Sequence, residues 1–281
     1  MEDILNKNEL DSLLESLSKA KDEESIESYI YIKNILDSIE FPLLFTIYLK
    51  GTKFVRSRAH KEDEDFFETV DQLSYRKDIR NIKKFGRANE PGQSIFYCAN
   101  NAIVSFAETN SVVREDEGKD FEYITTGIWI STEDIVVVNL LNNENTKDQH
   151  LEFDQSIKSF EDLIDSQNDE NAFAVRDLLQ FLSKEFSTSF KKNSNHYKIT
   201  SAFTNYVLLI ENVDGILYPS TIYPTDGFNF ALRTDVVDKK MKFYAAQRIK
   251  IQRIGEKEYK EVEKIESEIS VSNDNIIKWI R

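Results

Sequence analysis

The chain has 281 residues, of which 40% are hydrophobic and 31% are charged, a composition typical of a globular protein with a well-formed core. Its formal net charge of −14 argues against a general binder of nucleic-acid backbones, which would need a basic face. No run approaches the ~18 consecutive apolar residues of a membrane-spanning helix, and the polar N-terminus predicts no signal peptide. The single cysteine, Cys98, excludes an internal disulfide and indicates a reducing, cytoplasmic environment.

The first 40 residues predict two helices, because leucines and isoleucines recur at helical spacing in two separate stripes. The two stripes are Leu10, Leu13, Leu14 and Leu17, and Ile26, Tyr29, Ile30, Ile32 and Leu36. A polar connection between them indicates a helical hairpin that packs on the main domain or on a partner. Residues 41–50 are apolar and fit either a buried strand or a short helix.

Residues 53–58 read as a strand, in which Arg56 and Arg58 share one face at a period of two. Two neighbouring arginines can bind a diphosphate through their forked guanidinium groups. The alternative is an exposed strand edge whose arginines form salt bridges. Residues 60–85 are highly charged and predict a loop with a helical turn.

Residues 85–108 combine several signals of a small-molecule anion site. A loop carries Arg87 between two glycines, and residues 94–98 form a short apolar run with strand chemistry. Asn100 or Asn101 can cap the helix that follows, and this helix ends with a carboxylate, Glu108. Each residue also has an ordinary structural interpretation: a salt-bridged loop residue for Arg87 and a solvated helix residue for Glu108.

The rest of the chain predicts further strands and helices without the regular spacing of βαβ units, which favours an α+β fold. The expected strands are 121–130, 134–140 and 243–254, and residues 214–220 predict a turn that leads into a short strand ended by Pro219. The expected helices are 156–165, 170–186 and 197–211. Residues 142–155 are polar and loop-like. The predicted organisation is an N-terminal helical extension (1–48), a catalytic domain (49–255) with a helical insertion at about 142–212, and a charged C-terminal tail (256–281).

Several common kinds of active site have no support in the sequence. The three histidines, His60, His150 and His196, are scattered, so we expect no metal site. No Walker loop, G-x-G-x-x-G or G-x-S-x-G motif is present. The remaining arginine, tyrosine, glutamate and serine chemistry suits cleavage of a nucleotide's N-glycosidic bond, where a carboxylate stabilises a developing cation.

Three segments resemble the RES family, toxins of bacterial toxin–antitoxin modules named for an arginine, a glutamate and a serine. The segments are FVRSRAH (54–60), GRANEPGQSIFYCANNAIVSFAE (86–108) and DGILYPSTIYPTDGFN (214–229). The resemblance implies a mixed β core similar to that of ADP-ribosyltransferases, with NAD as substrate and no prosthetic group. It also implies inorganic phosphate as a possible co-substrate and an Xre-type antitoxin as partner. Ala88 departs from the commoner family loop, which has a bulky aromatic residue there.

The resemblance assigns roles to eight positions. The catalytic residues that it implies are Arg56, Glu108 and Ser220, and the NAD-binding residues are Arg58, Arg87, Asn89, Tyr97 and Asn229. Our first hypothesis is an NAD-degrading toxin that transfers ADP-ribose to phosphate or water. The alternatives are transfer of ADP-ribose to a macromolecule, and a catalytically silent binding module.

Overall fold

The computed structural model describes residues 7–61, 64–110, 120–141, 151–166, 170–188, 193–223, 227–255, 258–270 and 274–280. It divides into two compact units, each assembled from segments that are distant in sequence. The first unit comprises residues 1–46, 78–93 and 136–226, and the second comprises residues 47–77, 94–135 and 227–281. Strand β1 (Phe45–Tyr48) contains the first of these boundaries.

The first unit is mainly helical. Its helices are α1 (Lys7–Asp22), α2 (Ile26–Asp37), α5 (Leu151–Ser166), α6 (Glu170–Ser187) and α7 (Lys198–Leu208), with 3-10 turns η1 (Ile79–Asn81) and η2 (Ser194–Tyr197). Strands β5 (Ile135–Asn139) and β6 (Gly215–Pro219) pair in parallel, with Val138 opposite Ile216. Every residue of β6 is buried, as expected for a strand in the interior of a mixed fold.

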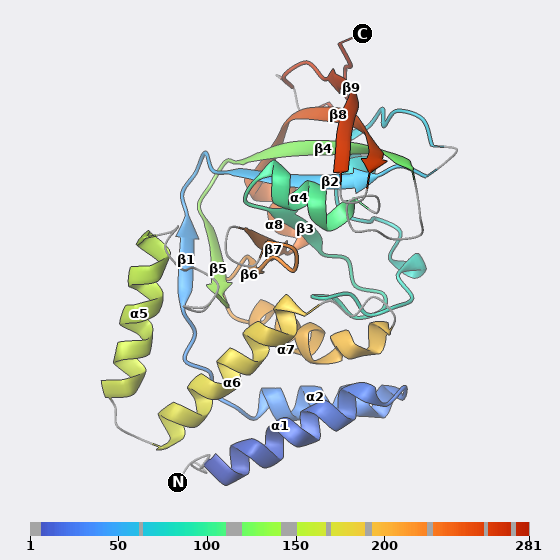
Figure 1. Cartoon of the computed structure of the whole chain (residues 1–281). Coiled ribbons are helices and arrows are strands. Elements are labelled where there is room, and N and C mark those ends of the chain that lie inside the picture. The colour runs from blue at the N-terminus through green and yellow to red at the C-terminus, as the bar shows by residue number, and fades with distance from the viewer. Residues whose placement is uncertain are drawn as a thin grey trace. The chain divides into compact units, whose positions relative to one another are not determined.

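The predicted N-terminal hairpin is confirmed, and within the first unit it packs against α6 and α7 (Figure 1). Leu10 and Leu17 of the first leucine stripe are buried. Lys198 of α7 is only 1% exposed, and its ammonium group donates to Ser28 Oγ at 2.7 Å, as well as to backbone carbonyls of the turn between α1 and α2. A second link joins Lys21 of α1 to Glu185 of α6 at 2.8 Å. The buried charges of Lys198 and Glu185 are therefore paired, as burial requires.

The second unit is built on an antiparallel sheet with the strand order β7-β3-β2-β4-β8-β9. The strands are β2 (Lys53–Ala59), β3 (Phe96–Ala99), β4 (Phe121–Ser131), β7 (Phe228–Leu232), β8 (Met241–Gly255) and β9 (Glu258–Glu266). Short helices α3 (Val70–Leu73), α4 (Ala102–Thr109) and α8 (Thr234–Lys240) connect them.

Aromatic side chains form the centre of this second unit. Phe96 and Trp129 meet edge to face with ring centroids 5.1 Å apart, and Phe54 meets Phe230 in the same way at 5.0 Å. All four residues are almost fully buried. Such contacts add to the hydrophobic gain from burial, so this aromatic cluster holds β2, β3, β4 and β7 together.

The α+β class and the predicted strands are confirmed, and four elements depart from expectation. Residues 151–155 belong to α5 and not to a loop, whereas residues 142–150 lie outside the described part of the chain. Strand β7 and helix α8 were not expected. Part of the predicted charged tail, residues 258–266, forms β9 because its backbone pairs with β8 while its charged side chains remain in water. Among the described residues, no helix is sufficiently long and apolar to cross a membrane.

Candidate functional site

The eight predicted site residues fall into two groups, one in each unit. The second unit contains Arg56, Arg58, Tyr97, Glu108 and Asn229, and the first contains Arg87, Asn89 and Ser220.

Glu108 and Asn229 meet in the second unit. Helix α4 starts directly after β3, where the Asn101 side chain accepts a hydrogen bond from Val104 N at 2.9 Å and caps the helix. The helix carries Glu108 in its last turn. Asn229 lies on β7 opposite Ala99 of β3, and its amide donates to Glu108 Oε1 at 3.2 Å. The carboxylate is therefore held by a side chain that also belongs to the predicted site.

Strand β3 pairs with β2 at Val55, and helix α4 packs against the same strand (Figure 1). The free backbone of β2 is satisfied by this helix: Ser57 N donates to Ser105 Oγ at 2.6 Å, and Thr109 Oγ1 donates to Ser57 O at 3.3 Å. A Cβ atom on Gly227 would lie 2.2 Å from a methyl carbon of Val104. The glycine is therefore needed for α4 to approach the start of β7 closely enough for Glu108 to reach Asn229.

Arg56 and Arg58 share one face of β2, as the period of two predicts, and both donate to carbonyls of α3. Arg56 donates to Leu73 O at 2.9 Å and to Tyr97 O at 2.6 Å. Arg58 donates to Gln72 O and forms an ion pair with Glu64 at 2.8 Å. Arg58 thus forms the kind of salt bridge that the sequence left open as an alternative. Nothing in the sequence predicts that carbonyl groups of α3 accept hydrogen bonds from these two arginines.

Cys98 lies on β3 beside Tyr97 and is not available as a nucleophile. Its side chain is 4% exposed. Burial raises the pKa of the thiol above its usual range, while the positive charge of Arg56 acts in the opposite direction. The sulfur therefore stays protonated and packs as a small apolar group.

Arg87 lies at the tip of a tight turn in the first unit. Gly86 N donates to Asn89 O at 2.9 Å, which closes the turn around Arg87 and Ala88. The Arg87 guanidinium donates to two carbonyls about 100 residues further along the chain, those of Phe186 and Thr188. It also faces the rings of Tyr197 and Tyr218, at 5.2 and 5.9 Å from their centroids. The planar cation is therefore held by aromatic and carbonyl contacts together.

Asn89 and Ser220 complete the group in the first unit. Asn89 is 7% exposed, and its amide donates to Glu90 O at 3.0 Å. Ser220 directly follows β6 and is fully buried. Its hydroxyl oxygen accepts from Ile222 N at 3.2 Å and from Tyr223 N at 3.1 Å, so it shapes the turn after the strand.

Comparison with protein families matches the RES domain over residues 57–250, which is more than half of the chain. The chain belongs to the RES domain family. All predicted site residues except Arg56 lie inside the matched range, and Arg56 directly precedes it. Comparison with curated proteins and with solved structures gives no match.

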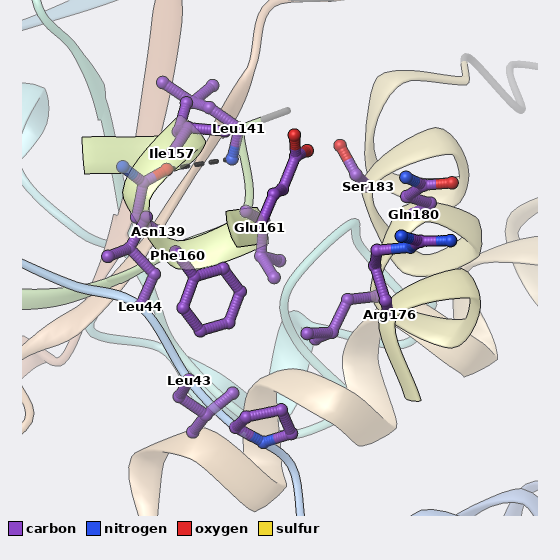
Figure 2. Close-up of a pocket in the computed structure, with 13 residues that line it drawn as sticks. Leu43, Leu44, Asn139, Leu141, Ile157, Phe160, Glu161, Arg176, Gln180 and Ser183 are labelled. Carbon is purple, nitrogen blue, oxygen red and sulfur yellow. Dashed lines mark hydrogen bonds between the residues drawn. The ribbon is translucent and has the colours of Figure 1, made fainter. Parts of the chain in front are cut away.

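The first unit of this RES domain protein contains an apolar cavity of about 40 Å³ between α5, α6 and the end of β5, and no predicted site residue lines it (Figure 2). Phe160 and Glu161 enter it from α5, and Arg176, Gln180 and Ser183 from α6. Burial raises the pKa of Glu161, although the nearby Arg176 lowers it. Because a single water molecule occupies ~30 Å³ of liquid volume, this space is far too small for a nucleotide.

His60 is a buried histidine in the second unit of the RES domain protein. Its ring stacks on Phe67 with centroids 4.0 Å apart. Nε2 lies 2.7 Å from Thr125 Oγ1, and Nδ1 lies 2.9 Å from the carbonyl oxygen of Asp65. A neutral ring that donates from Nδ1 satisfies both contacts. Burial lowers the pKa of His60 from its ordinary value of 6.5, and the charge of Arg248 adds to this effect.

We expect His60 to make folding stability depend on pH. The lowered pKa of the folded state means that its contribution is complete above pH ~6.5 and is lost as pH falls, because the unfolded chain then binds the proton more readily. Urea unfolding of the wild type and of His60→Gln should therefore show a stability difference that shrinks between pH 7.5 and pH 5. A difference that stays constant over this range would contradict the assignment.

Proposed function

We propose that this RES domain protein degrades NAD by breaking the bond between nicotinamide and ribose, and that ADP-ribose passes to phosphate or water. The proposal rests on the family membership and on one geometric observation, the Glu108 carboxylate held by the Asn229 amide at 3.2 Å. We further propose that the β core is of the ADP-ribosyltransferase type and that the protein acts as a toxin with an Xre-type antitoxin as partner.

The reaction needs a negative charge beside the ribose. When the N-glycosidic bond breaks, the bonding electron pair leaves with nicotinamide, which departs as a neutral ring, and the ribose becomes an oxocarbenium-like cation. A fixed carboxylate stabilises that cation in the transition state. In this proposal Glu108 is the carboxylate and Asn229 positions it. Water or phosphate then attacks the ribose carbon and loses a proton, which gives ADP-ribose or ADP-ribose phosphate.

The other predicted residues are assigned to binding or positioning. Arg56 is a planar cation of the kind that binds diphosphate or incoming phosphate, and its contacts to Leu73 O and Tyr97 O fix its position on the sheet. Tyr97 is proposed to pack against the nicotinamide ribose or its ring. Arg87 in the first unit, which has aromatic and carbonyl contacts, is assigned to the diphosphate by the family resemblance.

Arg58, Asn89 and Ser220 have contacts that also support the fold. Arg58 binds Glu64, Asn89 binds the backbone of its own turn, and Ser220 accepts two backbone hydrogen bonds. We assign Arg58 and Asn89 to NAD binding and Ser220 to orientation of nicotinamide or its ribose, on the family resemblance.

The test of this proposal is the identity of the products. NAD is incubated with the purified protein in the presence and absence of inorganic phosphate, and the products are separated and weighed by mass spectrometry. ADP-ribose phosphate that forms only with phosphate would indicate phosphorolysis, and ADP-ribose without phosphate would indicate hydrolysis. Intact NAD under both conditions would contradict the proposal. In that case the experiment is repeated with NAD labelled in its ADP-ribose part and an added macromolecule, and transfer of the label to the macromolecule would favour ADP-ribosyl transfer.

A further inference from the structure

The second unit has a large cavity that the proposed chemistry does not use. Its volume is about 770 Å³, within the range of sites for drug-sized or nucleotide-sized ligands. It is lined by the loop after β2, by the start of β4 and by residues of β8. None of its described lining residues belongs to the eight predicted site residues.

Arg248 of β8 forms the buried part of this cavity. The residue is 8% exposed, and its guanidinium carbon lies 4.0 Å from the ring centroids of both Phe66 and Tyr123. Its NH1 group lies 3.2 Å from Glu263 Oε1. Within the described part of the chain, its buried Nε–H has no hydrogen-bond acceptor. A guanidinium carries five N–H donors, so this cation is rigidly held and only partly satisfied.

An aromatic wall and a second cation lie beside Arg248. Tyr123 of β4 is paired with Lys250 of β8, and their strands place Phe121 on the same face. The Lys250 ammonium lies 4.6 Å from the ring centroid of Phe121, whose side chain is 50% exposed. With the ammonium group over one face of this exposed ring, a flat base can stack on the other face while the ammonium contacts an anionic group attached to the base.

The carboxylates of the cavity are either paired or lie at its outer edge. Glu64 is bound to Arg58 at 2.8 Å, and Asp65 and Asp120 are exposed. Glu122 also lines the cavity, but the residue is only 6% exposed. On the cationic side, Lys61 is exposed at the same edge. Arg248, which is paired with Glu263, and Lys250 are the cationic groups of β8 that line the cavity, and together they favour a ligand with an anionic group.

We propose that this cavity is a second ligand site, which binds a mononucleotide with its base on Phe121 and its phosphate against Arg248 and Lys250. Size, a flat exposed ring and two neighbouring cations, one of them buried, are the three observations that together favour this class of ligand. The site does not depend on NAD cleavage and uses none of the residues assigned to it.

The experiment is calorimetric titration of the full chain with AMP, adenosine and inorganic phosphate. AMP should bind more tightly than either of its parts. Phe121→Ala should weaken AMP binding about tenfold, since a stacked base contributes ~1–3 kcal/mol. Lys250→Ala should weaken binding of AMP and leave binding of adenosine unchanged. Phe45→Ala is the matched control, because this phenylalanine is 46% exposed on β1 and outside the cavity.

A third comparison tests whether binding in this cavity is independent of the residues proposed for NAD. Phe121→Ala and Lys250→Ala should turn over NAD as the wild type does, because neither residue is among those assigned to NAD. Arg248→Lys keeps the charge and removes the planar group, so it should weaken AMP binding in a chain whose folding is checked by urea unfolding. The inference is overturned if AMP does not bind, or if Phe121→Ala and Lys250→Ala bind AMP as tightly as the Phe45→Ala control.

Discussion

Replacing Glu108 with glutamine should lower NAD turnover about 10²–10³-fold, the typical cost of removing one electrostatic group that acts in the transition state. Glutamine keeps the length of the side chain and an oxygen that can accept from the Asn229 amide, whose present distance to Glu108 Oε1 is 3.2 Å. The fold should therefore persist while the negative charge beside the ribose is lost. The measurement is the rate of NAD loss at saturating NAD, with urea unfolding as the check on folding.

The matched control for Glu108→Gln is Glu133→Gln, which removes the same charge from an exposed position in the turn after β4. It should leave turnover unchanged, because exposed charges are screened by water and salt. If Glu108→Gln and Glu133→Gln turn over NAD at the same rate, Glu108 has no role in the mechanism.

Replacing Arg87 with lysine should raise the KM for NAD and lower the rate, with a combined loss of about tenfold or more in kcat/KM. A lysine ammonium is a point charge and cannot form the two parallel bonds with which a guanidinium binds a diphosphate. It also cannot face Tyr197 as a planar group while donating to Phe186 O and Thr188 O. We therefore expect a loss of stability as well as of NAD binding.

Arg80→Lys is the matched control, because it is the same substitution in the same unit at a side chain that is 90% exposed. Urea unfolding measures the structural part of the Arg87→Lys effect, and kinetics at a temperature where both variants are folded measure the binding part. If Arg87→Lys has the KM and rate of the Arg80→Lys control, Arg87 does not bind the diphosphate.

Local patterns in the sequence predict much of the second unit. The alternation through residues 53–58 and 121–130 gives β2 and β4, and the asparagine before an apolar helical stripe gives the cap of α4 at Asn101. These signals are strong because each depends on neighbouring residues only. Strand β9 shows the limit, since its many charges hide a strand that exists through pairing with β8.

Contacts between distant residues could not be predicted from the spacing of residues. Arg87 binds carbonyls at positions 186 and 188, and Arg56 and Arg58 bind carbonyls of α3. Backbone acceptors carry no side-chain signature, so nothing in the sequence marks them. The Glu108–Asn229 contact joins residues on a helix and on a strand that was not expected, and only the family resemblance indicated that both belong to one group.

The arginine at position 248 was also missed by the sequence interpretation. It lies in a strand whose other residues are mostly charged or aliphatic, and its partners Phe66, Tyr123 and Glu263 come from three different segments. A single arginine in a charged strand normally lies in water. Its burial between two rings depends on the loop after β2, which is a tertiary effect.

The most direct test of NAD cleavage is the amount of free nicotinamide released by the wild type and by Glu108→Gln, assayed side by side with the same NAD stock. We expect the wild type to release one nicotinamide for each NAD consumed, and the variant to release it about 10²-fold more slowly or less. Equal release by the two proteins, or no release by the wild type with phosphate present, would contradict the proposed function.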